Sequence, residues 1–143
     1  MTLYADYALR LLIYLAAKDD GLATIPEVAQ NYGISKNHLV KVAHRLVQDG
    51  YITGMRGAKG GLRLAHPAET VNLGEVFRRI EPDMALVPCF PPVNAPCPIV
   101  PACVLRDVLE DARSAFLKVL DGYTLADLAA PRKKLRELLR IAV

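Results

Sequence analysis

The sequence predicts a mainly α-helical protein with a small β-hairpin wing: a winged helix-turn-helix followed by a long dimerisation helix. Three observations carry this prediction. Two helical apolar patterns meet at a glycine turn, a glycine-rich segment separates two short strand patterns, and a long helical pattern begins at Val104. The chain has 143 residues, 52% of them hydrophobic, and a net charge of +3. This composition fits one globular unit with an accessory element and excludes extended disorder.

The first two helices are predicted from apolar spacing and from capping residues. Residues 3–17 repeat apolar side chains at the i, i+3, i+4 and i+7 positions, and Gly21 marks the expected end of this helix. A second helix should follow Thr24, which can cap its first turn. Pro26 suits the first positions of that helix and Glu27 complements the helix dipole.

A recognition helix is expected over residues 36–48. Gly33 allows the tight turn before it, and Ser35 can cap it. Its apolar side chains are expected to face the core: Leu39, Val40, Val42, Ala43, Leu46 and Val47. Two short helices joined by such a turn are typical of a helix-turn-helix, whose second helix enters the major groove of DNA. The alternative is an ordinary packed helix pair.

The residues near the start of the recognition helix are the expected DNA contacts, because asparagine and lysine can bond base edges there. They are Ser35, Lys36, Asn37, His38 and Lys41. Residues 36–63 carry six lysines and arginines against the single acid Asp49, a local excess that can neutralise phosphates. A solvated surface is the alternative explanation of this excess.

A wing is predicted after the recognition helix. Residues 51–55 and 62–64 are expected to form strands joined by the glycine-rich turn 56–61. Arg56 and Lys59 in that turn are candidate DNA contacts, and Arg56 is long enough to enter a narrow minor groove. A phosphate-cradling enzyme loop is the competing interpretation, but no Gly-Lys-Ser/Thr follows the glycines.

The second half of the chain is expected to be helical on both sides of a loop. Asn72 should cap a short helix over residues 73–80. Residues 104–120 form a longer pattern with one apolar face: Leu105, Val108, Leu109, Ala112, Phe116, Val119 and Leu120. Such a face indicates a two-fold dimer and hence a palindromic operator, with burial against the chain's own head as the alternative. A basic helix over residues 131–141 should lie at the surface.

The loop between these helices carries a candidate metal site. Residues 88–101 hold six of the ten prolines, and Cys89, Cys97 and Cys103 form a C-x7-C-x5-C pattern. Three sulfur donors suit an iron-sulfur cluster or zinc, both of which usually take four ligands. The fourth could be a histidine, a carboxylate such as Asp6, a small molecule or a group from a second subunit. A thiol switch and plain apolar packing of the cysteines are the alternatives.

The longest apolar run near the start is residues 11–17, which is too short to cross a bilayer. We therefore expect a cytoplasmic protein without a membrane partner, and in that compartment thiols stay reduced. A nucleophile with an adjacent base is not readable in the sequence, so an enzyme is not expected.

Several motifs together resemble the Rrf2 family of bacterial regulators over nearly the whole chain. They are DYALR at residues 6–10, ISKNHL at 34–39, GYI at 50–52, RGAKGGLRL at 56–64, the three cysteines with PAC at 101–103, and LDGYTLADL at 120–128. The resemblance is closest to the nitric-oxide-sensing branch of the family. The gap of seven residues between the first two cysteines is wider than is usual there and is reminiscent of the iron-responsive branch.

The resemblance implies a homodimeric repressor that releases operator DNA when nitric oxide modifies its cluster. The implied ligands are Cys89, Cys97 and Cys103, with Asp6 supplied by the other subunit, and a 4Fe–4S cluster is favoured over 2Fe–2S. The expected division is a DNA-binding domain (1–82), a cluster-binding loop (83–103) and a dimerisation helix with a C-terminal helix (104–143). An iron-responsive repressor and a non-sensing zinc or metal-free DNA-binding module are the alternatives.

Overall fold

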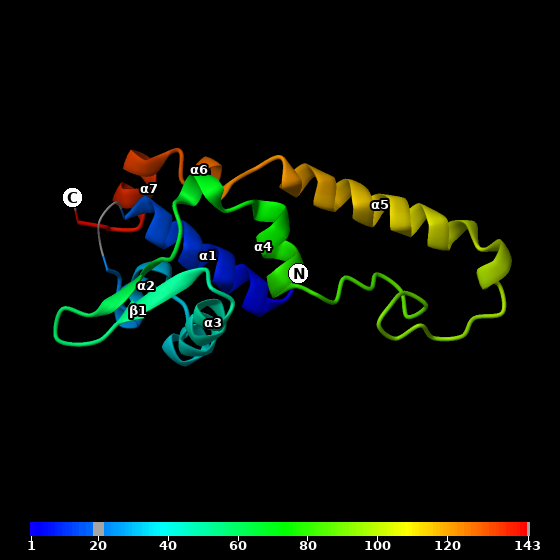
Figure 1. Cartoon of the computed structure of the whole chain (residues 1–143), viewed down its shortest axis with the longest axis horizontal. Coiled ribbons are helices and arrows are strands. Elements are labelled where there is room, and N and C mark those ends of the chain that lie inside the picture. Colours follow the sequence, from blue (N-terminus) through cyan, green and yellow to red (C-terminus); the bar gives the residue numbers. More distant parts are fainter. Residues whose placement is uncertain (19–21, 143) are drawn as a thin grey trace.

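The computed structural model describes residues 1–18 and 22–142, and it confirms a mainly helical chain with one two-stranded antiparallel hairpin (Figure 1). The elements in chain order are α1 (Leu3–Ala17), α2 (Ile25–Tyr32), α3 (Lys36–Gln48), β1 (Ile52–Met55), β2 (Gly61–Leu64), the 3-10 turn η1 (Ala68–Thr70), α4 (Leu73–Ile80), the 3-10 turn η2 (Val100–Ala102), α5 (Val104–Asp121), α6 (Leu125–Leu128) and α7 (Arg132–Leu138). The predicted end of the first helix at Gly21 lies outside the described residues.

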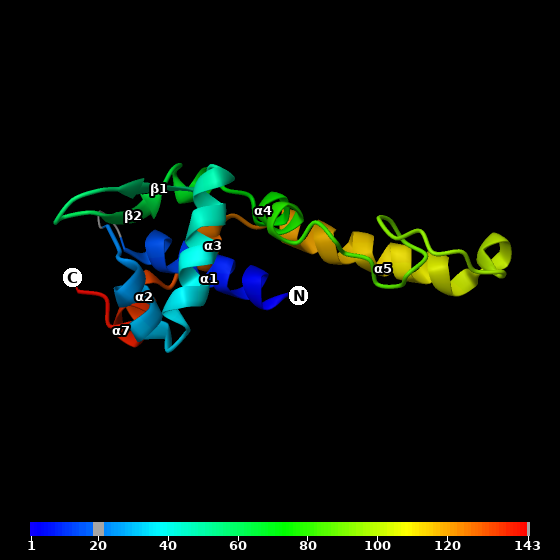
Figure 2. The same ribbon diagram turned by 90° about the horizontal axis from the view of Figure 1, so that it is seen from below.

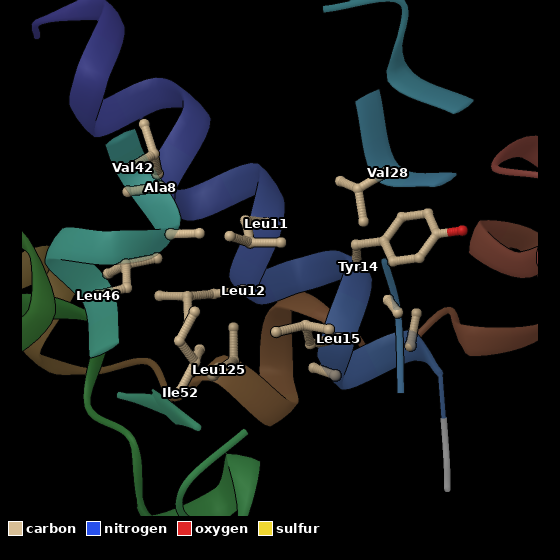
Figure 3. Close-up of a cluster of buried hydrophobic side chains, with 14 of the residues drawn as sticks. Ala8, Leu11, Leu12, Tyr14, Leu15, Val28, Val42, Leu46, Ile52 and Leu125 are labelled. Atoms are coloured by element: carbon tan, nitrogen blue, oxygen red, sulfur yellow. The ribbon is translucent and has the colours of Figure 1, made fainter. Parts of the chain in front are cut away.

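Helix α1 is the centre of the head, the part of the chain formed by residues 1–82 and 122–142. It buries eight residues, among them Leu11, Leu12 and Tyr14, and it packs against α3, β2, α4, α6 and α7. Figure 3 shows these side chains meeting Val28 from α2 and Ile52 from β1. Because each neighbouring element contributes to one apolar cluster, α1 fixes the positions of the surface elements around it.

The helix-turn-helix is confirmed, together with the capping that predicts it. Thr24 and Glu27 form a reciprocal capping box at the start of α2. Gly33 takes the left-handed conformation, with a φ of 68°, and the Ser35 side chain accepts a hydrogen bond from the backbone N–H of His38. These two residues set the turn between α2 and α3, as expected.

The prediction that all six apolar side chains of α3 face the core is wrong for two of them. The four at i, i+3, i+4 and i+7 are buried: Leu39, Val42, Ala43 and Leu46. Val40 and Val47 are 48% and 42% exposed. Each follows a buried residue by one position, which turns it by about 100° around the helix and out of the apolar stripe.

The wing is a short hairpin whose strands pair from Ile52 opposite Leu64 to Met55 opposite Gly61. Its turn requires glycine at two positions. Gly57 has a φ of 107°, and a Cβ on Gly60 would overlap the backbone oxygen of Met55. The hairpin differs from the prediction by one residue at the start of each strand.

The remaining residues form an arm that leaves the head. Figures 1 and 2 both show α5 projecting away from the other helices. The loop 83–103 runs outward from α4 beside it, and α5 then returns to the head. We call residues 83–121 the cysteine arm. It is joined to the head where Phe77 packs edge-on to Phe116 at 5.3 Å and where the Arg78 guanidinium pairs with Asp121.

Along α5, all of which the structure describes, no residue is buried. Val104, Leu105, Val108 and Val119 are each more than half exposed. The expectation of an apolar face is therefore confirmed. Phe116 on this face contacts the head through Phe77, but no residue of the face is buried. Helix α7 is shorter than the predicted 131–141. Among the described helices, none is long and apolar enough to cross a membrane.

Candidate functional site

The predicted DNA contacts on α3 lie on its outer side. Lys36, Asn37 and Lys41 are exposed, and so is Ser35, whose hydroxyl oxygen is already used as the helix cap. His38 is only half-exposed, because its ring lies edge-on to the ring of Tyr7 at 5.2 Å. The start of α3 therefore presents cationic and amide side chains to the exterior, as major-groove reading requires.

The wing adds two more cations. Arg56 and Lys59 are both exposed in the hairpin turn, and Figure 1 shows the hairpin and α3 along the same edge of the head. Arg45, further along α3, is partly neutralised by Asp49, whose carboxylate also pairs with Arg79 of α4 at 3.3 Å. The predicted contacts on α3 and on the wing therefore belong to one side of the head.

The three cysteines line one pocket between the loop and the first turns of α5. The pocket has a volume of about 340 Å³, and the other residues that line it are Val87, Pro88, Ala95, Pro96, Ile99, Leu105, Arg106 and Leu109. Cys89 and Cys103 are partly buried, Cys97 is exposed, and all three are free thiols. The structure thus brings together side chains that are 14 positions apart, from Cys89 to Cys103.

Cys103 has a second structural role as the N-cap of α5. Its sulfur accepts a hydrogen bond from the backbone N–H of Arg106 at 3.4 Å. Serine, threonine and asparagine are the usual caps, so a cysteine here places a sulfur where the partial positive charge of a helix N-terminus is concentrated. The pocket therefore suits a centre with negative charge.

A single buried side chain anchors the loop to α5. Phe90, directly after Cys89, is 1% exposed. The guanidinium carbons of Arg106 and Arg113 lie 5.5 Å and 5.4 Å from the centre of its ring, within range of cation–π attraction. Arg113 is also paired with Glu110 at 2.6 Å. Sequence reasoning missed these residues, although an aromatic residue inside a proline-rich loop is a signal of burial.

The chemistry of the donor set suits an iron-sulfur centre or zinc. A volume of about 340 Å³ is that of a small-ligand pocket, and soft thiols suit iron-sulfur centres. In the described part of the chain, no three histidine, cysteine, aspartate or glutamate side chains converge closely enough for one metal ion.

Asp6 does not complete this pocket within its own chain. Its carboxylate accepts a hydrogen bond from Nε of Arg10 at 3.1 Å, one turn along α1. Neither Asp6 nor a histidine is among the described residues that line the cysteine pocket. A fourth protein ligand would have to come from outside this set.

Comparison with known proteins agrees with the fold and shows the family. The family described as "Rrf2: Iron-dependent Transcriptional regulator" matches residues 1–131. The chain is 46% identical over 142 residues to the HTH-type transcriptional regulator NsrR of Bacillus subtilis, covering 99% of this chain and 97% of that protein. It is also 46% identical to NsrR of Bacillus licheniformis over 140 residues, covering 97% and 98%.

Solved structures show the same architecture. The cysteine regulator CymR of B. subtilis matches with a TM-score of 0.74 and 27% identity over 91% of this chain and 95% of that one. IscR of T. potens has the same fold, with a TM-score of 0.73 and 23% identity over 95% and 90%. These relatives are transcriptional regulators, which confirms the expectation of a regulator rather than an enzyme. The chain belongs to the Rrf2 family of transcriptional regulators.

Proposed function

We propose that this protein is a homodimeric repressor that holds an iron-sulfur cluster and releases operator DNA when nitric oxide modifies that cluster. The observation that carries the proposal is the pocket in which Cys89, Cys97 and Cys103 meet. The 46% identity to two NsrR regulators supports it, because the sequence motifs resemble the nitric-oxide-sensing branch.

The proposed division of labour follows the shape of the chain. Residues 1–82 form the DNA-binding domain, residues 83–103 the cluster-binding loop, and residues 104–143 the dimerisation helix with the C-terminal helix. Support comes from the position of α5, which projects from the head (Figure 2). Its apolar residues Val104, Leu105, Val108 and Val119 are exposed.

A second copy of this chain is the proposed partner of α5. Val104, Leu105, Val108 and Val119 form an exposed apolar surface on a helix of 18 residues. In a two-fold dimer, the same surface of α5 from each subunit would form the contact. The two α3 helices could then meet successive major grooves roughly 34 Å apart, which predicts a palindromic operator.

DNA reading is assigned to α3 and the wing. Ser35, Lys36, Asn37, His38 and Lys41 would meet the major groove, and Arg56 and Lys59 would reach the adjacent backbone or minor groove. Their exposure on one side of the head supports this assignment. Several phosphate contacts of this kind make binding strongly salt-dependent.

The cluster ligands are proposed to be Cys89, Cys97 and Cys103, with Asp6 of the second subunit as the fourth. The Asp6 carboxylate is held by Arg10 in the single chain, so ligation would share or replace this ion pair. A 4Fe–4S centre is favoured over 2Fe–2S. When bound, it supplies iron that nitric oxide attacks. Release of Asp6 would then let each head shift relative to the other subunit's arm, and half-sites at fixed spacing would no longer be matched.

Response to iron alone is the second candidate function. The seven-residue gap between Cys89 and Cys97 and the description of the family as iron-dependent favour it. In that case, loss of the cluster during iron shortage would release DNA without nitric oxide.

Anaerobic purification with a visible spectrum, repeated after stoichiometric nitric oxide, tests the proposal. We expect a brown protein whose visible absorption changes with nitric oxide while it releases its operator. Cys89→Ala should be colourless, and Cys89 is a suitable choice because Cys103 also caps α5. A colourless wild type that binds the operator as well as Cys89→Ala would contradict the proposal and indicate a zinc or metal-free module. Release only on iron depletion would select the second candidate.

A further inference from the structure

Arg106 is a cation inside the cysteine pocket that the cluster proposal leaves without a role. It lies in the first turn of α5, three residues after Cys103, and it lines the pocket together with the three thiols. Its Nε atom is buried and has no hydrogen-bond partner among the described residues. An unpaired buried donor on a group that is always protonated costs more than a neutral one.

The surroundings of Arg106 define what could satisfy it. Apart from Arg106, the pocket is lined by the three cysteines and by seven apolar or proline side chains, among them Leu105 and Leu109. Among the side chains that line the pocket, the hydrogen-bond acceptors are therefore the sulfur atoms. Thiolates and the sulfides of an iron-sulfur centre accept hydrogen bonds, and both carry negative charge.

We propose that Arg106 donates its Nε–H to the inorganic centre and balances its negative charge, which makes Arg106 a positioning and tuning residue. This inference rests on the proposed function, because it needs the cluster. Phe90 holds the guanidinium in place, with the Arg106 guanidinium carbon 5.5 Å from its ring centre. Because Phe90 follows Cys89, the same contact ties the orientation of the donor to the position of a ligand.

Arg113 provides a matched control on the same helix. Its guanidinium carbon lies 5.4 Å from the Phe90 ring centre, much like that of Arg106. It is paired with Glu110 and is not among the residues that line the cysteine pocket. Removal of Arg113 thus tests loop packing, whereas removal of Arg106 tests packing together with the donor.

The experiment compares Arg106→Met, Arg106→Lys and Arg113→Met as full-length proteins reconstituted anaerobically with iron and sulfide. The readouts are the reduction potential of the cluster and the rate of its loss to a chelator, with far-UV circular dichroism as the folding control. We expect R106M to lose the cluster about 10 to 100 times faster than wild type, the usual cost of an outer-shell partner. Its potential should shift to more negative values, because a positive charge near the centre favours the reduced state.

Arg113→Met is expected to remain close to wild type in both readouts, and R106K, which keeps the charge, should fall between wild type and R106M. Equal effects of R106M and R113M, or a wild-type potential and loss rate in R106M, would overturn the inference while leaving the proposed function intact. If R106M does not fold, wild-type behaviour of R106K would overturn it. A wild type that takes up no iron and sulfide would overturn the proposed function, and this inference with it.

Discussion

The head and the cysteine arm of this protein differ in how far their apolar side chains are buried. In the head, one cluster of buried apolar residues joins α1 to the surrounding helices and to the hairpin, and side-chain caps begin α1, α2, α3, α4 and α6. In the arm, α5 has an apolar surface that is exposed along its described length, and the loop has three free thiols. Phe90 is the residue that packs the loop most deeply.

The contrast indicates which part depends on partners. The head contains what a stable fold needs, a closed core and satisfied helix ends. The arm has one buried side chain in its loop, Phe90, and none on α5. Under the proposed function, a second copy on α5 and an inorganic centre in the pocket would supply the missing contacts. Stability should therefore reside in the head, and regulation in the arm.

The largest expected effect is on the core of the head. Leu11 is fully buried on α1, so Leu11→Ala should lower the free energy of unfolding by about 2 to 5 kcal/mol through lost burial and a cavity. Denaturant unfolding measures this. Leu105→Ala, a similar truncation at a position that is 61% exposed, is the control. An equal loss of stability in the two variants at a concentration where the protein is monomeric would contradict the contrast.

A charge introduced on the exposed apolar side of α5 should weaken dimerisation rather than lower the stability of the head. Val108 is 54% exposed, and Val108→Asp is expected to weaken dimerisation by about 2 kcal/mol or more, because it would bury an unpaired carboxylate. Sedimentation equilibrium gives the dissociation constant. Ser114→Asp puts the same charge on the opposite side of the helix and should leave the dimer intact. A monomeric S114D, or a dimeric V108D with unchanged affinity, would argue against α5 as the dimer contact.

On the predicted DNA-binding surface of α3, Lys41→Ala is expected to weaken operator binding. If Lys41 contacts one phosphate, the slope of log affinity against log salt concentration should fall in magnitude by about 0.9. Fluorescence anisotropy over a salt series measures both quantities. Lys134→Ala removes an exposed cation from α7, where it pairs with Glu137 at 3.4 Å, and should change neither. An unchanged affinity together with an unchanged slope in K41A would remove Lys41 from the interface.

The smallest expected effect is a pH dependence inside the head. Burial by itself would raise the Glu27 pKa, but hydrogen bonds from Lys18 and Tyr14 outweigh it and lower the pKa below its usual value of 4.5. A lowered carboxyl pKa stabilises the fold above the unfolded-state pKa, and this contribution is lost as the pH falls through the folded-state value.

Urea unfolding between pH 6 and pH 3 checks this expectation. Glu27→Gln should reduce the loss of unfolding free energy between pH 6 and pH 3 by less than about 1 kcal/mol, since the Lys18–Glu27 pair is partly exposed. A larger loss of unfolding free energy on acidification in E27Q than in wild type would contradict a lowered Glu27 pKa.

Local signals were sufficient to predict most of the head. Thr24, Gly33, Ser35 and Asn72 act within one turn of their own position, so the sequence reveals their roles directly. Val40 was assigned to the core because it is apolar, but only its place around the helix decides burial. Apolar content alone does not carry that information.

The sequence predicts that the three cysteines share a site, and the structure places them in one pocket, whereas the surroundings of that pocket were not predictable. The spacing of Cys89, Cys97 and Cys103 signals a metal site, but the contacts of Phe90 with Arg106 and Arg113 join a loop to a helix up to 23 positions away. Such contacts depend on how the loop lies beside α5. The pairing of Asp6 with Arg10 is equally a property of the folded helix, although its i, i+4 spacing could have suggested it.

Operator affinity before and after removal of the inorganic centre tests the central claim most directly, that the arm controls the head. Anaerobic anisotropy titrations would compare the cluster-loaded dimer with the same preparation after demetallation, at one salt concentration. The account predicts tight, salt-dependent binding by the loaded dimer and a loss of at least about tenfold, or 1.4 kcal/mol, after demetallation. Equal affinity in the two states, with both samples dimeric, would contradict it.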